Sequence, residues 1–324
     1  MILITGDVHN RMTYGHPSCK GNFDEASAAL KYSKLAAEEG INVTLFVTGR
    51  ALLEHAGVFQ SIAELKNVEL GGHGWDSFCK PRMRSALWAL TGSRHGPRWY
   101  QKMEITRTLG AFRAVLGRDP ESWRQHAYYT DEHSYSLLVA AGIKVVSDRV
   151  VSGPQRHCWW AHQEIKKLNC GLWSVPINTS PDHDTLVHGG LGQEQMDVLT
   201  KQLLRGRTGN SVQRRTQRAV VRVRQLLSAV QDIEILPWSG EIMYANTGAR
   251  VLPASAWEKL IMEQIEDQIG RTGFATLLLH PICMELLDEM GAFRRILRFC
   301  NKIPSSFIRT ISKVNGEITQ IQGP

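Results

Sequence analysis

The sequence predicts an α/β protein built on a mainly parallel β-sheet, and three observations support this prediction. The chain has 324 residues, of which 43% are apolar, which is enough for a sizeable buried core. Short apolar runs alternate with helical patterns over most of its length, the order typical of parallel strands joined by right-handed crossovers. Polar residues that suit acid-base or metal chemistry follow nearly every apolar run.

The expected strands are short apolar runs. The first is MILIT at 1–5, which reads as a buried strand, and the second is NVTLFVT at 42–48. Later runs of the same kind predict strands at 67–72, 121–127, 143–149, 172–178 and 274–280.

The expected helices lie between these strands. Residues 23–40, FDEASAALKYSKLAAEEG, form the first, which Gly40 closes. Similar patterns predict helices at 51–65, 98–117, 131–142 and 256–270. Residues 190–250 have no place in this alternation, so we interpret them as a helical insertion. The expected organisation is one domain over 1–324, with its core in 1–189 and 251–308.

Two features bear on the location of the protein. No run approaches the ~20 consecutive apolar residues of a membrane-spanning helix, and MILITGD leads directly into a core strand without the pattern of a signal peptide. The six cysteines include no CxxC pair, so they favour neither a zinc ribbon nor a disulfide framework. We expect a cytoplasmic protein with reduced, mostly buried cysteines.

The net charge of +7 comes from a single segment. Residues 201–230 contain eight Lys or Arg and no acidic residue, and the rest of the chain has 30 basic residues against 31 acidic ones. Apolar and arginine residues recur there on different helical faces, which predicts a basic amphipathic helix. This helix could be a solvated surface element. It could also dock to anionic lipid headgroups at the inner face of a membrane or to a phosphate-bearing substrate, with nucleic acid the less favoured partner.

The carboxyl ends of parallel strands hold the chemistry in this architecture. Asp7 and His9 follow the first strand and flank Val8, so both side chains point to the same side of an extended segment. His73 comes from another strand end. Imidazole and carboxylate together suit zinc and similar divalent ions. Each residue alone also has an ordinary structural interpretation, such as a turn cap for Asp7.

Five motifs then follow one another in order: TGDVH, VTLFVTG, HGWDS, WRQHAYY with the downstream LLVAAGIKVVS, and LLLHP. This series resembles the polysaccharide deacetylases, the NodB-homology or carbohydrate esterase family four group, over roughly residues 1–300. The resemblance implies a distorted, partly open (β/α) barrel. It also implies metal-dependent hydrolysis of an N-acetyl group on an amino sugar.

The resemblance also implies roles for particular residues. Asp7 matches the catalytic base, and Arg124 matches the arginine that holds the carboxylate of that base. His280 matches the general acid that protonates the leaving amine, and His73 matches a metal ligand. A histidine suits the acid role because its pKa lies near working pH.

The metal motifs depart from the family pattern at two positions. Val8 replaces the second acid of the opening motif, and His9 occupies the position that a variant pattern gives to a ligand. Ser77 replaces the second histidine of the usual His-x-x-x-His pair. We therefore expect His9, His73 and Asp76 as metal ligands. A residue of the PDHD loop remains an alternative third ligand: Asp182, His183 or Asp184.

Three further residues are predicted to contact the sugar. Trp75, next to His73, is a candidate for stacking on a pyranose ring. The proline and tyrosine of the family's arginine motif are shifted or absent here, but His126 and Tyr128 lie nearby, so we expect them to line the substrate site.

The resulting hypothesis is a cytoplasmic, metal-dependent carbohydrate N-deacetylase, with zinc as the expected ion. Its expected substrate is a nucleotide-linked or lipid-linked N-acetylated sugar, because the basic helix suits phosphates or a membrane surface. One alternative is a deformylase acting on a lipid-linked formamido sugar. Another is a catalytically silent carbohydrate-binding relative, which the Ser77 substitution favours. A nucleotide-binding fold is disfavoured, since no GxGxxG or GxxxxGK[ST] motif follows the first strand.

Overall fold

A computed structural model describes residues 1–10, 24–76, 95–126, 132–149, 164–182, 254–303 and 308–314, with the single residues 91, 93 and 130. The basic segment at 201–230, most of the predicted insertion, and Ser77, Tyr128, His183 and Asp184 lie outside these residues. Within the described part of the chain, no helix is long and apolar enough to cross a membrane.

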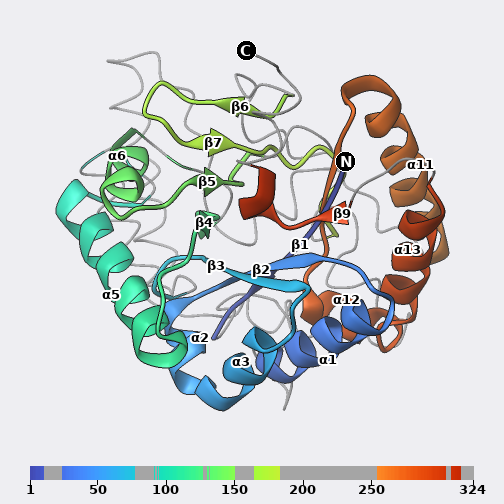
Figure 1. Ribbon diagram of the computed structural model, residues 1–324, viewed down its shortest axis with the longest axis horizontal. Coiled ribbons are helices and arrows are strands. Elements are labelled where there is room, and N and C mark those ends of the chain that lie inside the picture. Colours follow the sequence, from blue (N-terminus) through green and yellow to red (C-terminus); the bar gives the residue numbers. More distant parts are fainter. Residues whose placement is uncertain are drawn as a thin grey trace, which may run out of the picture.

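The strands alternate with helices along the chain, as the sequence predicts (Figure 1). The strands are β1 (Ile2–Val8), β2 (Val43–Val47), β3 (Val68–Gly72), β4 (Ser122–Trp123), β5 (Val145–Val146), β6 (Lys166–Lys167), β7 (Trp173–Ser174), β8 (Ala275–Leu278) and β9 (Ile308–Arg309). The helices are α1 (Glu25–Glu38), α2 (Gly49–Glu54), α3 (Ala56–Ala63), α5 (Arg98–Leu116), α6 (Glu132–Ala140), α11 (Ala254–Thr272), α12 (Pro281–Asp288) and α13 (Gly291–Lys302), followed by the 3₁₀ helix η3 (Ile311–Lys313).

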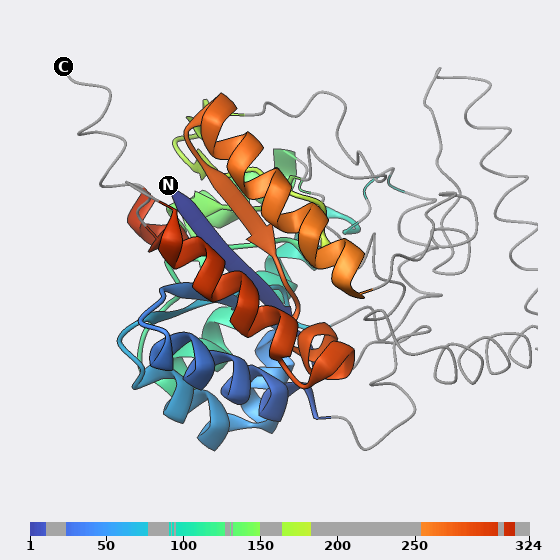
Figure 2. The same ribbon diagram turned by 90° about the vertical axis from the view of Figure 1, so that its right-hand side faces the viewer.

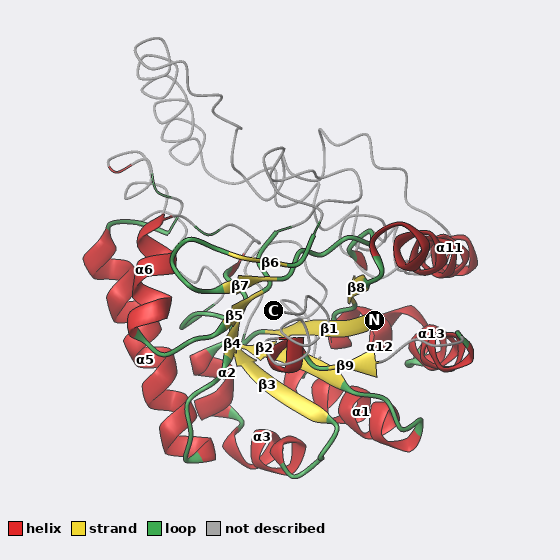
Figure 3. Cartoon of the chain, turned by 45° about the horizontal axis from the view of Figure 1, so that its top comes forward, coloured by secondary structure: helices red, strands yellow, loops and turns green. Residues whose placement is uncertain are grey.

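Among the described residues these strands form one sheet in the order β6-β7-β5-β4-β3-β2-β1-β8, with β9 also paired to β1. All pairs are parallel except β6 with β7. The sheet curls, and the helices surround its outer side (Figures 1 and 3). Figure 2 shows α11 and α13 over β1 and β8. This is the distorted, open (β/α) barrel that the sequence predicts.

Successive side chains of β1 point to opposite faces of the sheet. Ile2 and Ile4 belong to the large cluster beneath the outer helices, where Tyr32 of α1 stacks on Phe293 of α13 with ring centroids 3.7 Å apart. Leu3 instead belongs to an interior cluster that includes Ile311 of η3. Odd-numbered residues of β1 therefore face the inside of the barrel, and this alternation determines where Asp7 lies.

Several elements differ from the sequence-based prediction. The helix expected at 51–65 is two helices, α2 and α3, because His55 leaves the helical conformation with φ −127° and ψ 41°. The strand expected at 121–127 is reduced to β4, two residues long. Helices α12 and α13 were not predicted, and neither was antiparallel β6, whose two lysines are exposed and lack the apolar pattern of a strand.

Candidate active site

The carboxyl ends of adjacent parallel strands bring the predicted site residues together. Asp7 of β1 pairs with Phe46 of β2. Gly72 of β3 pairs with Val47 of β2 on one side and with Trp123 of β4 on the other. His73 and Arg124 each follow one of these paired positions, and His280 follows β8 on the other side of β1. All of these side chains are almost completely buried.

Arg124 holds Asp7 in a buried network. Its Nη1 donates to Oδ1 of Asp7 at 2.8 Å, and its Nη2 donates to the hydroxyls of Thr5 at 2.8 Å and Ser147 at 2.9 Å. Its Nε donates to the carbonyl of Ser147 at 2.6 Å, and the guanidinium stacks 4.3 Å from the centre of the Phe46 ring. Charge-assisted bonds of this kind fix one oxygen of Asp7 firmly. The second oxygen faces the histidines.

The ionisation of this network follows from its burial and its charges. Burial opposes ionisation of Asp7, but Arg124, with smaller contributions from His73, His280 and His9, outweighs it and holds the pKa at about 2. Burial lowers the pKa of His73 to about 3, although Asp7 acts in the opposite direction. His73 is therefore neutral at neutral pH, and the guanidinium of Arg124 is the main counter-charge of Asp7.

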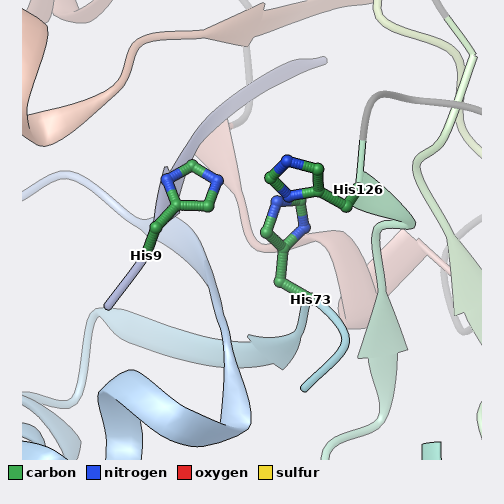
Figure 4. Close-up of side chains that lie close together, drawn as sticks. All are labelled: His9, His73 and His126. Atoms are coloured by element: carbon green, nitrogen blue, oxygen red, sulfur yellow. The ribbon is translucent and has the colours of Figure 1, made fainter. Parts of the chain in front are cut away.

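The imidazole rings of His9, His73 and His126 lie close together (Figure 4). The ring centroids of His9 and His73 are 5.1 Å apart, and each lies 5.0 Å from the ring of His126. One nitrogen from each ring lies within 4.8 Å of one nitrogen of the other two, a spacing that a single metal ion could bridge. The three histidines come from the ends of β1, β3 and β4, with β2 lying between β1 and β3 in the sheet.

Hydrogen bonds at Nδ1 orient two of these rings. Nδ1 of His73 lies 2.8 Å from the carbonyl oxygen of Arg124, so this nitrogen carries the proton and Nε2 offers its lone pair. Nε2 of His73 lies 3.7 Å from Oδ2 of Asp7. Nδ1 of His9 lies 3.3 Å from Oε2 of Glu25, which leaves its Nε2 facing the other rings in the same way.

His280 is held by a second carboxylate. Its Nδ1 lies 2.6 Å from Oδ1 of Asp182, and its backbone N–H donates to Oδ2 of the same residue at 2.6 Å. Its Nε2 lies 3.8 Å from Oδ2 of Asp7. Asp182, His280 and the buried Cys283 also lie close enough to hold an ion. Because Asp182 already accepts two bonds from His280, we interpret this group as the support of His280.

The other predicted residues lie around this centre. Asp76 lines a narrow pocket beside the rings of His73 and His126, but it is outside the three-residue ligand group. Trp75 is half-buried and packs on the core, where a side chain in place of Gly49 would meet its ring at 3.0 Å. This packing restricts the ring face that the stacking hypothesis requires. Tyr128 lies outside the described residues.

Two residues acquire an importance that the sequence-based interpretation did not give them. His126 was expected to contact substrate, yet its ring lies among the candidate metal ligands. A signal existed, because His126 follows Arg124 by two residues and side chains at that spacing share a side of an extended segment. Glu25 was not predicted at all, since an acidic residue in the first turn of a helix is common for reasons of helix stability.

No family model matches the sequence, and no curated protein sequence matches it. Solved structures do share its fold. A protein from Mycobacterium smegmatis provisionally named as a polysaccharide deacetylase has a TM-score of 0.63 and 13% identity, over 100% of this chain and 91% of that one.

Two further solved structures have a similar fold to this chain. A probable polysaccharide deacetylase from Pseudomonas aeruginosa PAO1 has a TM-score of 0.58 and 8% identity, over 98% of this chain and 90% of that one. The Puue allantoinase has a TM-score of 0.57 and 9% identity over the same shares. The predicted NodB-type fold is therefore confirmed. Identities this low show a shared fold, and the activity has to be inferred from the site.

Proposed function

We propose that this chain, which has the fold of the polysaccharide deacetylases, is a metal-dependent hydrolase that removes an N-acetyl group from an amino sugar. One observation carries the proposal. Three imidazole rings lie together beside Asp7, which Arg124 holds on one side, while His280, held by Asp182, approaches its free oxygen from the other. A base, an acid and a set of metal-competent donors therefore share one buried centre.

The donor set fits a divalent ion, zinc best among the common ones. Neutral imidazole is a preferred zinc donor, and three protein ligands with an open position are typical of catalytic zinc sites. The depressed pKa of His73 keeps its ring neutral, as a ligand must be. We assign His9, His73 and His126 as the ligands. A bound zinc ion would polarise the acyl carbonyl and lower the pKa of water there.

Asp7 acts as the general base in this proposal. Its Oδ2 is free of Arg124 and lies 3.7 Å from Nε2 of His73 and 3.8 Å from Nε2 of His280. A carboxylate with a pKa of about 2 is ionised at any working pH, but it is a weak base. It can accept a proton only from unusually acidic water. This requirement supports metal dependence.

His280 acts as the general acid that protonates the leaving amine. Asp182 accepts a hydrogen bond from Nδ1–H of His280, which fixes the ring so that Nε2 points toward the reacting centre. Arg124 makes no contact with the reacting atoms in this proposal; it keeps Asp7 charged and in place.

The substrate we propose is a nucleotide-linked or lipid-linked N-acetylated sugar in the cytoplasm, with formyl in place of acetyl as a close variant. The support is the charge of residues 201–230, which suits phosphates or an anionic membrane surface. Trp75 and Tyr128 remain candidates for contacts with the sugar. Asp76 was expected as a metal ligand; it lines the pocket beside His73 and His126, so we propose it as a sugar contact instead.

The experiment compares zinc content and acetate release in the purified protein, His126→Ala and His133→Ala. His133 is an exposed histidine of α6 and serves as the matched control. We expect about one zinc per chain and acetate release from N-acetylhexosamine derivatives by the wild type and the control, and loss of both in His126→Ala. A wild-type protein that holds no metal and releases neither acetate nor formate with zinc added would contradict the proposal and favour a silent carbohydrate-binding relative.

A further inference from the structure

We infer that Glu25 is a positioning residue of the metal site, which fixes the ring of His9 and raises the affinity of the site for a divalent cation. This inference rests on the proposed function and adds to it a residue from the first turn of α1. Its support is the geometry of the carboxylate around His9.

Glu25 binds His9 at two points. Its Oε2 accepts the backbone N–H of His9 at 2.7 Å and lies 3.3 Å from Nδ1 of the ring. The pair is shielded from water, because the side chain of His9 is 2% exposed and that of Glu25 is 4% exposed. A buried carboxylate on one ring nitrogen fixes the tautomer and directs the other nitrogen toward the ligand site.

The position of His9 explains why it needs this partner. β1 ends at Val8, so His9 lies just beyond the last residue that the sheet pairing fixes. Its backbone N–H donates to the carboxylate of Glu25 and not to a neighbouring strand. His73 is held differently, because its backbone N–H donates to the carbonyl of Val47 and its Nδ1 contacts the Arg124 carbonyl. Glu25 therefore binds the backbone N–H and the Nδ1 of His9, whereas two backbone carbonyls bind the same two groups of His73.

Glu25 is itself held in place. It is the first residue of α1, whose N-cap, Asp24, accepts the N–H of Ala26 at 2.9 Å. The place of Glu25 in the first turn is a common one for an acidic residue, because the helix dipole has its positive end there. The helix packs on β1 and on α12, so the carboxylate approaches His9 from a rigid element.

The charge of Glu25 also suits the proposed site. The three assigned ligands are imidazoles, which bind a metal ion as neutral ligands, and the nearby Asp7 is already paired with Arg124. A dication bound by these rings would lack a compensating charge among its ligands. Glu25 provides one through the imidazole of His9, and a carboxylate behind a histidine makes that ring a stronger donor.

The test compares zinc affinity in Glu25→Gln, Glu25→Asp and the control Glu69→Gln. Glu69 also accepts several bonds, from Ser122, Thr44 and the backbone of Ser312, but it does so in a separate network. Zinc dissociation constants are measured by competition with a chromogenic chelator, and the visible spectrum of the cobalt-loaded protein reports the ligand geometry. Thermal unfolding of the metal-free proteins separates loss of fold from loss of affinity.

We expect zinc to bind about 10- to 100-fold more weakly in Glu25→Gln, the usual effect of removing a carboxylate behind a metal-bound histidine. Glu25→Asp keeps the charge but shortens the reach, so we expect partial recovery of affinity with an altered cobalt spectrum. Glu69→Gln should bind zinc as the wild type does. Wild-type affinity and spectrum in Glu25→Gln would overturn the inference and leave the proposed function intact. A wild type without zinc affinity would instead refute the proposed function itself.

Discussion

Protonation of His73 should control a measurable part of the stability of the metal-free protein between pH 7 and pH 5. The ring is almost completely buried, and burial lowers its pKa from 6.5 to about 3. As the pH falls below 6.5, the unfolded chain takes up a proton at this position and the folded protein does not. Stability is therefore lost as the pH decreases, and the loss continues until the pH reaches the folded pKa.

The size of the effect follows from the two pKa values. Between pH 7 and pH 5, one histidine with these values costs about 2 kcal/mol of unfolding free energy, since one pKa unit corresponds to about 1.4 kcal/mol. The Asp7 carboxyl does not contribute in this range, because its folded pKa of about 2 is below that of the unfolded chain and its effect begins only below about pH 4. The prediction concerns the difference between the wild type and a variant of His73.

The assay is urea unfolding of the chelator-treated protein at pH 7, 6 and 5, for the wild type, His73→Gln and His133→Gln. We expect the wild type and His133→Gln to lose stability in parallel. His73→Gln should lose about 2 kcal/mol less between pH 7 and pH 5, because its side chain takes up no proton in either state. Parallel curves for the wild type and His73→Gln would show that His73 is not held neutral in the folded protein, and the reasoning from burial would be wrong.

Three further predictions concern the rest of the centre and the strand junction beside it. Arg124→Leu leaves the charge of Asp7 buried without its partner and should cost about 3–5 kcal/mol in urea unfolding, whereas the double variant with Asp7→Asn should recover part of that loss. His280→Gln should lower the rate of acyl hydrolysis by about 10²- to 10⁴-fold without changing zinc affinity in a chelator competition. Gly72→Ala would place its Cβ 2.2 Å from the Trp123 ring, so it should destabilise the protein by about 1–3 kcal/mol in thermal unfolding; wild-type stability would contradict this.

The topology of the fold could be predicted because the hydrophobic pattern is strong where the elements are long. Strand β1 and helix α5 lie close to their predicted positions. The errors occur where the pattern is weak or interrupted. His55 separates α2 from α3, although it is neither a proline nor a glycine. β6 consists of two exposed lysines, which form a strand because they pair with β7.

The convergence of Asp7, His73, Arg124 and His280 could be predicted for a related reason. Asp7 lies near the end of β1 and the other three follow the ends of parallel strands, and parallel strands deliver their carboxyl ends to the same edge of a sheet. The contacts of Asp7 with the other three residues agree with that expectation. The partners behind these residues could not be predicted, because Asp182 and Glu25 act through tertiary contacts across 98 and 16 residues of sequence.

The position of His126 suggests why the Ser77 substitution need not abolish a metal site. A His-x-x-x-His pair places two ligands on one helical turn, so that local structure sets their spacing. Here the candidate ligands come one each from the ends of β1, β3 and β4, and the pairing of β1, β2, β3 and β4 in that order sets their spacing. Gly72 and Trp123 face each other at the junction of β3 and β4, immediately before His73 and Arg124. Close packing at this junction therefore holds two of the three rings at a distance suited to a shared ion.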